Sequence, residues 1–292
     1  FLHNSALMEG GAVYVKEIDV LKQINCQLFK NKIKSDGGGM YCYRTTHIII
    51  FNSEYCKNIA ISLGGGVSIF YTVRVQIVKA KFINNRAKTG VGIHIMKFED
   101  TRIIMNLFVE NFALSTGGGM QLENVDITFQ AKLSILYSYF TGNSADQSGA
   151  VMHIKNVKTL QMFDALIVVN QRYNITISVL NVHVQHMILY NILLQGLSTS
   201  PVLVDAVAQF MTFKNIMFEC PKFAYLHDET VVNTDDAFVE VQYQCTHCKQ
   251  GYYLVQPNIL SISSMINYAT SNPKTIRCYK CPIHATCRDG TI

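Results

Sequence analysis

The chain has 292 residues and a mass of 32.9 kDa, enough for one large all-β domain or two ordinary domains. Apolar residues make up 49%, which excludes global disorder, whereas charged residues make up only 15%, against about 25% in a typical soluble domain. The net charge of +5 comes from scattered basic residues without a run of three, so the sequence does not support a nucleic-acid-binding surface.

The ends of the sequence suggest a piece of a longer polypeptide. The chain opens at Phe1 inside a pattern that recurs later, with neither an initiator Met nor a signal peptide. Its apolar stretches, near Ile48–Phe51 and Met187–Leu194, fall short of the roughly 18 residues that span a bilayer, so we expect no transmembrane span in this segment.

A repeat of about 26 residues is the most informative feature of the first half. An aromatic residue is followed by Asn at +3, Ala at +5 and then a glycine cluster, and six copies start 28, 26, 27, 26 and 32 residues apart. The aromatic positions are Phe1, Phe29, Tyr55, Phe82, Phe108 and Phe140, and the Asn positions are Asn4, Asn58, Asn85, Asn111 and Asn143. In the second copy Lys32 and Lys34 replace the Asn and the Ala.

This period and content predict a stack of β-strand coils. The repeat is too short for a helix pair, and the glycine cluster in each copy would break a helix. Short β-rich runs lie between the clusters: Ala12–Val15, Ile48–Phe51, Val73–Val78, Ile103–Phe108 and Ile175–Val184. A single copy cannot bury its apolar side, but copies stacked in register can, so we predict a right-handed parallel β-helix.

In such a stack the aromatic positions form an inner ladder, and each buried ring contributes about 1.5–3 kcal/mol by area transfer. The Asn positions form a second ladder that caps turn carbonyls, and the Ala fits a tight inner corner. The segments Val168–Asn170, Leu193–Gln195 and Met217–Glu219 indicate that the stack continues after the glycine signature fades at Gly149. We therefore expect about 9–10 coils over residues 1–243.

The cysteines indicate a second module over residues 244–292. Six of the nine follow residue 219, which suggests an oxidising compartment: Cys220, Cys245, Cys248, Cys278, Cys281 and Cys287. Two C-x-x-C pairs also suit a four-cysteine zinc site, but the 29 residues between them exceed the usual 15–20, so disulfides are favoured over a metal site. For Cys26, Cys42 and Cys56 we expect buried free thiols.

Both halves resemble known families. The F-x-x-N-x-A pattern followed by glycines, over about residues 1–155, resembles the repeats of chlamydial polymorphic membrane proteins and of β-helix ("pectin-lyase-like") surface proteins. The stretch Cys245–Ile292 is similar to growth-factor-receptor-like cysteine-rich modules, cut short, and large ciliate surface proteins join such modules to β-helix repeats. The resemblance implies a rod that serves as an adhesin or scaffold.

The motifs that resemble catalytic sites are better explained by ordinary structural roles. The run Asn233–Asp236 superficially looks like the N-T-D motif of polygalacturonases, but the second Asp pair, the His-Gly and the Arg-x-Lys of that family do not follow. Lyases need an acidic calcium cluster, whereas acidic residues here are dispersed apart from Glu99–Asp100 and Asp235–Asp236. We therefore predict neither an enzyme nor a cofactor.

Histidines and one sequon are the remaining candidates for sites. His183 and His186 lie three apart in a β-type segment and should face opposite sides, and His94 fits an outward strand position, so no metal site is assigned. Asn174 begins the sequon Asn174–Thr176 and is predicted to carry a glycan in a secreted protein.

The predicted function is structural: an extracellular or cell-surface scaffold or adhesin that reaches its location through the secretory pathway. Its expected partners are copies of itself, which could extend into a filament, the rest of a longer polypeptide, and surface glycans. The alternatives are a carbohydrate-active lyase or hydrolase on the same fold and a non-catalytic glycan-binding module.

Overall fold

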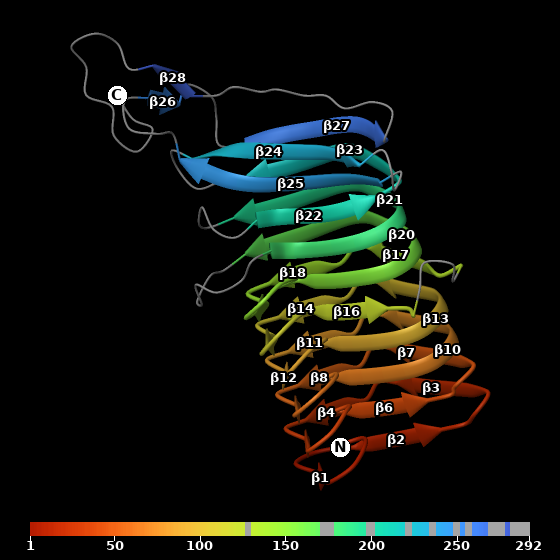
Figure 1. Cartoon of the computed structure of the whole chain (residues 1–292). Coiled ribbons are helices and arrows are strands. Elements are labelled where there is room, and N and C mark those ends of the chain that lie inside the picture. The colour runs from red at the N-terminus through yellow and green to blue at the C-terminus, as the bar shows by residue number, and fades with distance from the viewer. Residues whose placement is uncertain are drawn as a thin grey trace.

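The computed structural model describes residues 1–125, 130–169, 178–196, 202–219, 224–233, 238–247, 252–254, 259–267 and 278–280. Every regular element in these ranges is a β-strand. The strands wind into a parallel β-solenoid of about seven turns, each pairing with the turns before and after it (Figure 1). The predicted all-β class and parallel β-helix are confirmed. Nowhere in the described ranges does a helix occur that is long and apolar enough to cross a membrane.

Each turn passes through four strand rows, of which the first two form the longer faces. The first row contains β2 (Val13–Lys16), β6 (Met40–Tyr43), the start of β10 (Val67–Val78), the start of β13 (Ile93–Ile104), β16 (Met120–Glu123), the starts of β20 (Met152–Val169) and β21 (Ser178–Gly196), and β22 (Val202–Ala208). The second row contains β3 (Val20–Ile24), β7 (His47–Phe51), the ends of β10 and β13, β17 (Lys132–Leu136), the middles of β20 and β21, and the start of β23 (Phe210–Glu219).

The third and fourth rows are short. The third contains β4 (Gln27–Phe29), β8 (Glu54–Cys56), β11 (Lys81–Ile83), β14 (Leu107–Val109) and β18 (Tyr139–Thr141), followed by the ends of β20, β21 and β23. The fourth contains β1 (Ser5–Ala6), β5 (Lys32–Ile33), β9 (Ile59–Ala60), β12 (Arg86–Ala87), β15 (Phe112–Ala113) and β19 (Ser144–Ala145).

A column of stacked rings fills the interior of the third row. Tyr55, Phe82, Phe108 and Phe140 are fully buried, and their successive ring centroids lie 5.0, 4.9 and 4.7 Å apart with planes within 11° of parallel. Alternate residues of each strand point inward, so the repeat period places every ring above the one before it. The offset-stacked contacts add to the area that each ring buries.

A ladder of asparagines lines the turn between the third and fourth rows. The Oδ1 atom of Asn111 accepts hydrogen bonds from the backbone N and the Nδ2 of Asn85, at 3.1 and 3.0 Å. Its own Nδ2 donates to the carbonyl oxygen of Phe82 at 2.9 Å. The same pattern connects Asn58 to Asn85 and Asn111 to Asn143. Each amide therefore satisfies buried backbone groups of its neighbouring turns.

One predicted ladder position is wrong. In β4 the residue aligned with Tyr55 is Leu28, which is fully buried, whereas Phe29 aligns with the half-buried Cys56. Because successive strand residues point to opposite faces, this one-residue offset places the Phe29 ring on the outer surface.

The offset carries through the rest of that turn. Asn31, and not Lys32, occupies the asparagine ladder, where it accepts hydrogen bonds from the backbone N and the Nδ2 of Asn4. Ile33, and not Lys34, lies in the small apolar cluster at the inner corner. Phe1 belongs to the first described turn, and 60% of it is exposed.

Glycines allow neighbouring turns to approach closely. A Cβ atom on Gly118 would lie 2.3 Å from the carbonyl oxygens of both Ser144 and Ala150, which is too close for any other residue. Gly117, one residue earlier, has a φ of +68°, a conformation that costs other residues about 1–2 kcal/mol. The glycine cluster therefore serves both a turn and a close backbone contact.

The parallel stack ends sooner than the predicted 9–10 coils. β22 and β23 pair in parallel with β21, but they pair antiparallel with β25 (Phe238–His247) and β27 (Ile259–Asn267), and β24 (Ala224–Asn233) pairs antiparallel with β25. The repeat of aromatic residue, Asn, Ala and glycine cluster ends at Gly149, and β21, β22 and β23 still pair in parallel after it, before the antiparallel strands begin. Beyond it, β26 (Tyr252–Leu254) and β28 (Cys278–Lys280) form a separate antiparallel pair.

Candidate functional site: an outer groove over β13, β17 and β20

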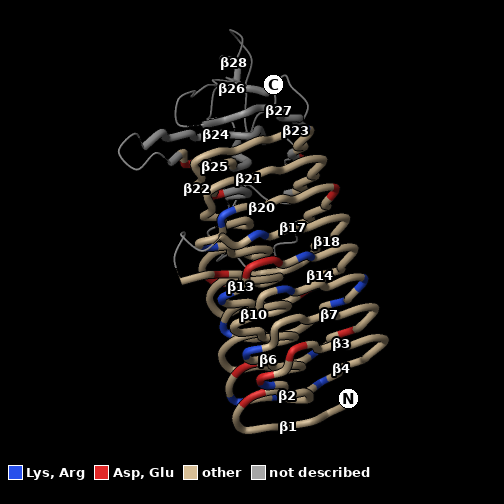
Figure 2. The backbone as a smooth tube through the Cα atoms, turned by 90° about the vertical axis from the view of Figure 1, so that its right-hand side faces the viewer, with Lys and Arg blue, Asp and Glu red and all other residues tan. Residues whose placement is uncertain are grey.

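The outer face of the second row carries aligned polar side chains. Arg74, Asp100 and Lys132 are in register on β10, β13 and β17. Because Val75 and Leu133 fill the inward positions, the three charged side chains point away from the core. Figure 2 shows that Lys, Arg, Asp and Glu lie mainly along the turns from β2 to β20.

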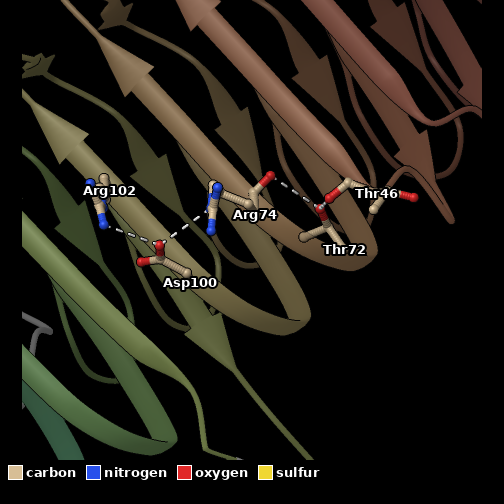
Figure 3. Close-up of polar contacts among 5 residues, drawn as sticks. All are labelled: Thr46, Thr72, Arg74, Asp100 and Arg102. Carbon is tan, nitrogen blue, oxygen red and sulfur yellow. Dashed lines mark hydrogen bonds and ion pairs between the residues drawn. The ribbon is translucent and has the colours of Figure 1, made fainter.

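Asp100 is held between two guanidinium groups. Its Oδ2 lies 3.5 Å from Arg74 Nε and 3.5 Å from Arg102 Nη2 (Figure 3). The Asp100 side chain is 24% exposed, against about half for each Arg. Ion pairs this exposed contribute about 0–1 kcal/mol to stability. Their main effect is to orient the two guanidinium groups on one face.

The neighbouring corner is connected through its threonines. Thr72 Oγ1 donates to the carbonyl oxygen of Thr46 at 3.4 Å and to that of Arg74 at 3.5 Å (Figure 3). The first contact links two successive turns, and the second fixes the backbone at Arg74. The part of β10 that presents the Arg74 side chain is therefore hydrogen-bonded to the preceding turn.

An open groove of about 920 Å³ continues across β13, β17 and β20. Its lining includes the cations Arg102, Lys132 and Lys158, the carboxylates Glu99 and Asp100, the amides and hydroxyls Gln130, Ser134, Thr159 and Gln161, and the apolar Ile104, Leu133 and Leu136. Lys158 Nζ donates to Gln130 Oε1. The lining therefore combines three cations and several hydrogen-bonding groups with two carboxylates and three apolar side chains.

The carboxylates in this groove do not have the arrangement of a glycosidase. Such enzymes use two carboxyl groups on opposite sides of the scissile bond. Glu99 and Asp100, the carboxylates among the lining residues, are consecutive in one strand, and Asp100 is engaged by two Arg side chains. The groove is suited to binding a polar or anionic ligand and has no acid–base pair among its lining residues.

A second group of polar side chains lies beneath the glycine turns of the first row. Ser68, His94, Gln121 and His153 are in register on the outward face of the strands. Ser68 and His94 are nevertheless fully buried, because each turn folds back over the strand that follows it. A Cβ on Gly90 would lie only 2.8 Å from the Cβ of His94.

Burial makes His94 a neutral imidazole. Desolvation lowers the pKa of His94 to about 4, and neither ring nitrogen has a hydrogen-bond partner among the described residues. The hydroxyl groups of Ser68 and Thr89 are likewise buried without a partner there. The sequence predicts an outward strand position for His94; the residue does alternate with the core residues Ile93 and Ile95, but the glycine turn covers it and leaves it fully buried.

His183 and His186, expected to face opposite sides, are both half-buried and alternate with the buried Val184 and Met187, so both lie on the outer side of β21. His183 and His186 align with Lys155 and Thr159, and the His186 ring stacks on Phe210 at 5.1 Å. In the described ranges no three His, Cys, Asp or Glu side chains come close enough to hold a metal ion.

The cysteines fall into two sets. Cys26, Cys42 and Cys56 are free thiols; Cys42 is buried, while the other two are half-buried. Burial raises the pKa of the Cys42 thiol to about 12. Cys245 lies in β25 and Cys278 in β28, and their side chains lie outside what the structure describes, as do Cys220, Cys248, Cys281 and Cys287.

Two other positions from the sequence analysis lie wholly or partly outside the described residues. The glycosylation site Asn174 lies outside the described residues. Asn233 ends β24, and the Thr234–Asp236 part of the N-T-D-like run lies outside them as well.

Comparison with protein families, with curated proteins and with solved structures finds none that matches this chain.

Proposed function

We propose that this chain is a non-catalytic structural scaffold or adhesin, displayed outside the cell or on its surface. The observation that carries the proposal is the continuous ladder of Tyr55, Phe82, Phe108 and Phe140 with the asparagines beside it. Such ladders fill the interior of a turn and couple it to the next, which produces a stiff stack whose long faces are available for contact.

The finer parts of the proposal rest on the sequence. The repeat resembles that of right-handed β-helix surface proteins, and the cysteine-rich segment after residue 243 suits a secreted, disulfide-bonded module. In this proposal Asn174 carries a glycan, and the partners are copies of the chain, the rest of a longer polypeptide, or surface glycans.

Localisation and catalysis can be tested separately. Labelling of intact cells that produce the protein, with a membrane-impermeant biotin reagent, is expected to modify it without lysis. If the protein is labelled only after the cells are lysed, the proposed surface location is wrong. Incubation of the purified chain with polysaccharides of different acidity is expected to release no new reducing ends, and a release that depends on Asp100 would favour the enzyme.

The outer groove favours a glycan-binding role as the second candidate. Its 920 Å³ volume, its hydroxyl and amide groups and its three cations suit an oligosaccharide that carries carboxylate or sulfate groups. A glycan array read with the wild-type chain and with Lys132→Ala/Lys158→Ala tests this role. Retention that is equal for both proteins would exclude the groove as the binding site.

A further inference from the structure

The corner between the second and third strand rows carries one outward side chain from each turn, exposed at positions 52, 79, 105 and 137 and half-buried at Asp164 and Asn191. Six successive members of this corner row are Asn52, Lys79, Met105, Tyr137, Asp164 and Asn191. Each directly follows a residue of the registered column Phe51, Val78, Ile104, Leu136, Phe163 and Tyr190. All six have φ between 47° and 56°. The side chains are therefore spaced evenly, about 4.8 Å apart, along one edge of the stack.

Two members of the corner row are unusual for this backbone conformation. Asn and Asp tolerate positive φ well, whereas a bulky side chain there is uncommon and costs free energy. Met105 and Tyr137 nevertheless occupy adjacent corner positions and are 50% and 57% exposed. Leu107 and Tyr139, half-buried on the next strand row, are in register beside them. An apolar patch thus interrupts an otherwise polar edge.

Three of the four polar members, Asn52, Asp164 and Asn191, form hydrogen bonds within the chain. Asn52 Nδ2 donates to Asn25 Oδ1 at 2.8 Å, and Asn191 Nδ2 donates to Asp164 Oδ1 at 2.8 Å. These contacts stabilise the ends of the corner row within the chain itself. Met105 and Tyr137, at the centre of the row, are instead large, exposed side chains.

The corner row is chemically complementary to a second copy of itself that runs in the opposite direction. Counted outward from the point midway between Met105 and Tyr137, the first pair is apolar, the second is Lys79 with Asp164, and the third is Asn52 with Asn191. A two-fold axis perpendicular to the stack at this point would place Lys79 of one copy opposite Asp164 of another. Met105 would then lie against Tyr137, a sulfur–aromatic contact.

We propose that two copies of this chain associate side by side and antiparallel through the corner row. The dimer contains two Met105–Tyr137 contacts at its centre and two Lys79–Asp164 ion pairs around them. Aromatic residues and Met are enriched at the centres of such interfaces, and charged residues at their rims. The dimer requires neither the ligand nor the cellular location proposed above.

The charges also select the antiparallel arrangement. Two parallel copies that meet at the same corner would place Lys79 against Lys79 and Asp164 against Asp164. Like charges in direct opposition weaken association. The antiparallel arrangement replaces both repulsions by attractions and forms a closed dimer, because the same patch is used on both copies.

A charge swap tests the proposal. Sedimentation velocity of the full 292-residue chain over a concentration series is expected to show a dimer. Lys79→Asp alone, or Asp164→Lys alone, creates two repulsive pairs and should raise the dissociation constant at least about tenfold. The double variant Lys79→Asp/Asp164→Lys restores both pairs with reversed sign and should return the constant to within about threefold of the original.

A matched control is available on the same molecule. Lys57 is exposed and has a φ of +56°, but it lies on the next corner of the stack, between the third and fourth rows. Lys57→Asp should leave the dimer unchanged, and Met105→Ser/Tyr137→Ser should weaken it while thermal melting shows that both variants fold. A chain that is monomeric at about 100 µM, or a dimer that the double swap fails to restore, would overturn the proposal.

Discussion

The ring of Phe82 stacks on that of Phe108, with centroids 4.9 Å apart and planes 11° from parallel. The two residues are aligned one above the other on β11 and β14, in neighbouring turns of the chain. This contact, repeated with Tyr55 and Phe140, is the structural basis of the first prediction.

Removing one ring from the ladder should destabilise the stack. Phe108→Ala creates a cavity between two rings and is expected to lower the free energy of unfolding by about 3–5 kcal/mol. Phe29→Ala is the matched control, because that ring lies on the outer surface and should cost under about 1.5 kcal/mol. Urea unfolding measures both, and equal effects would contradict the ladder.

The asparagine ladder should contribute less than the rings. Asn111→Ala leaves the backbone N of Asn85 and the carbonyl oxygen of Phe82 without their partner, which costs about 1–3 kcal/mol. Urea unfolding of this variant beside Phe108→Ala compares the two ladders. A larger loss for Asn111→Ala than for Phe108→Ala would reverse the order expected here.

Stability should fall between pH 6.5 and pH 4, because His94 takes up a proton more readily in the unfolded state. The folded-state pKa of His94 is lowered to about 4, below the usual value of 6.5, so the unfolded state binds the proton more readily. The contribution of the neutral His94 to the free energy of unfolding is fully present above pH 6.5. It is lost as the pH falls toward 4, by about 3 kcal/mol in all. His153 acts with the same sign, because desolvation, and then Lys155, lower its pKa.

The variant His94→Gln isolates this contribution, because Gln121 already occupies the equivalent position one turn later. Denaturant unfolding between pH 7 and pH 4 should show a shallower loss of stability than in the wild type. Two parallel pH curves would mean that His94 is able to take up a proton in the folded state.

The Asp100 carboxylate should limit anion binding in the groove. Asp100→Asn frees Arg74 and Arg102 from their ion pairs and should delay elution from a sulfated matrix, while stability changes by under about 1 kcal/mol. Lys132→Ala should advance elution, since it removes a cation from the same groove. Unchanged retention of both variants would place anion binding elsewhere.

Mass spectrometry should separate the two sets of cysteines. Without reduction, most of Cys220, Cys245, Cys248, Cys278, Cys281 and Cys287 are expected in disulfides, whereas Cys26, Cys42 and Cys56 should alkylate after denaturation. Cys42 should be the slowest of the three to react in the folded protein, because it is buried and its pKa is raised. One bound zinc ion with alkylatable tail thiols would instead indicate a four-cysteine metal site.

The sequence by itself determined the architecture over most of the first half. The spacing of Tyr55, Phe82, Phe108 and Phe140 specified the turn, because a ring that recurs with the period of a coil can be buried only against its own repeats. The Asn at +3 identified the turn that it caps. These signals are local, and each copy repeats them, so no knowledge of distant contacts was needed.

The tertiary structure decided what depends on register between turns. A one-residue offset in β4 placed Phe29 outside and Leu28 inside, and the sequence did not reveal it because both side chains are apolar. The glycine turn buried His94, although alternation alone marked it as an outward residue.

The groove and the corner row also arose only in three dimensions. Arg74, Asp100 and Lys132 are 26 and 32 residues apart, and Met105 and Tyr137 are 32 apart, so unequal repeat lengths conceal their alignment. The pairing of the strands keeps these residues in register although one repeat is longer than the others. This pairing brings their side chains onto one face. The sequence specified how each turn closes, and the hydrogen-bonded register between turns determined which surface side chains meet.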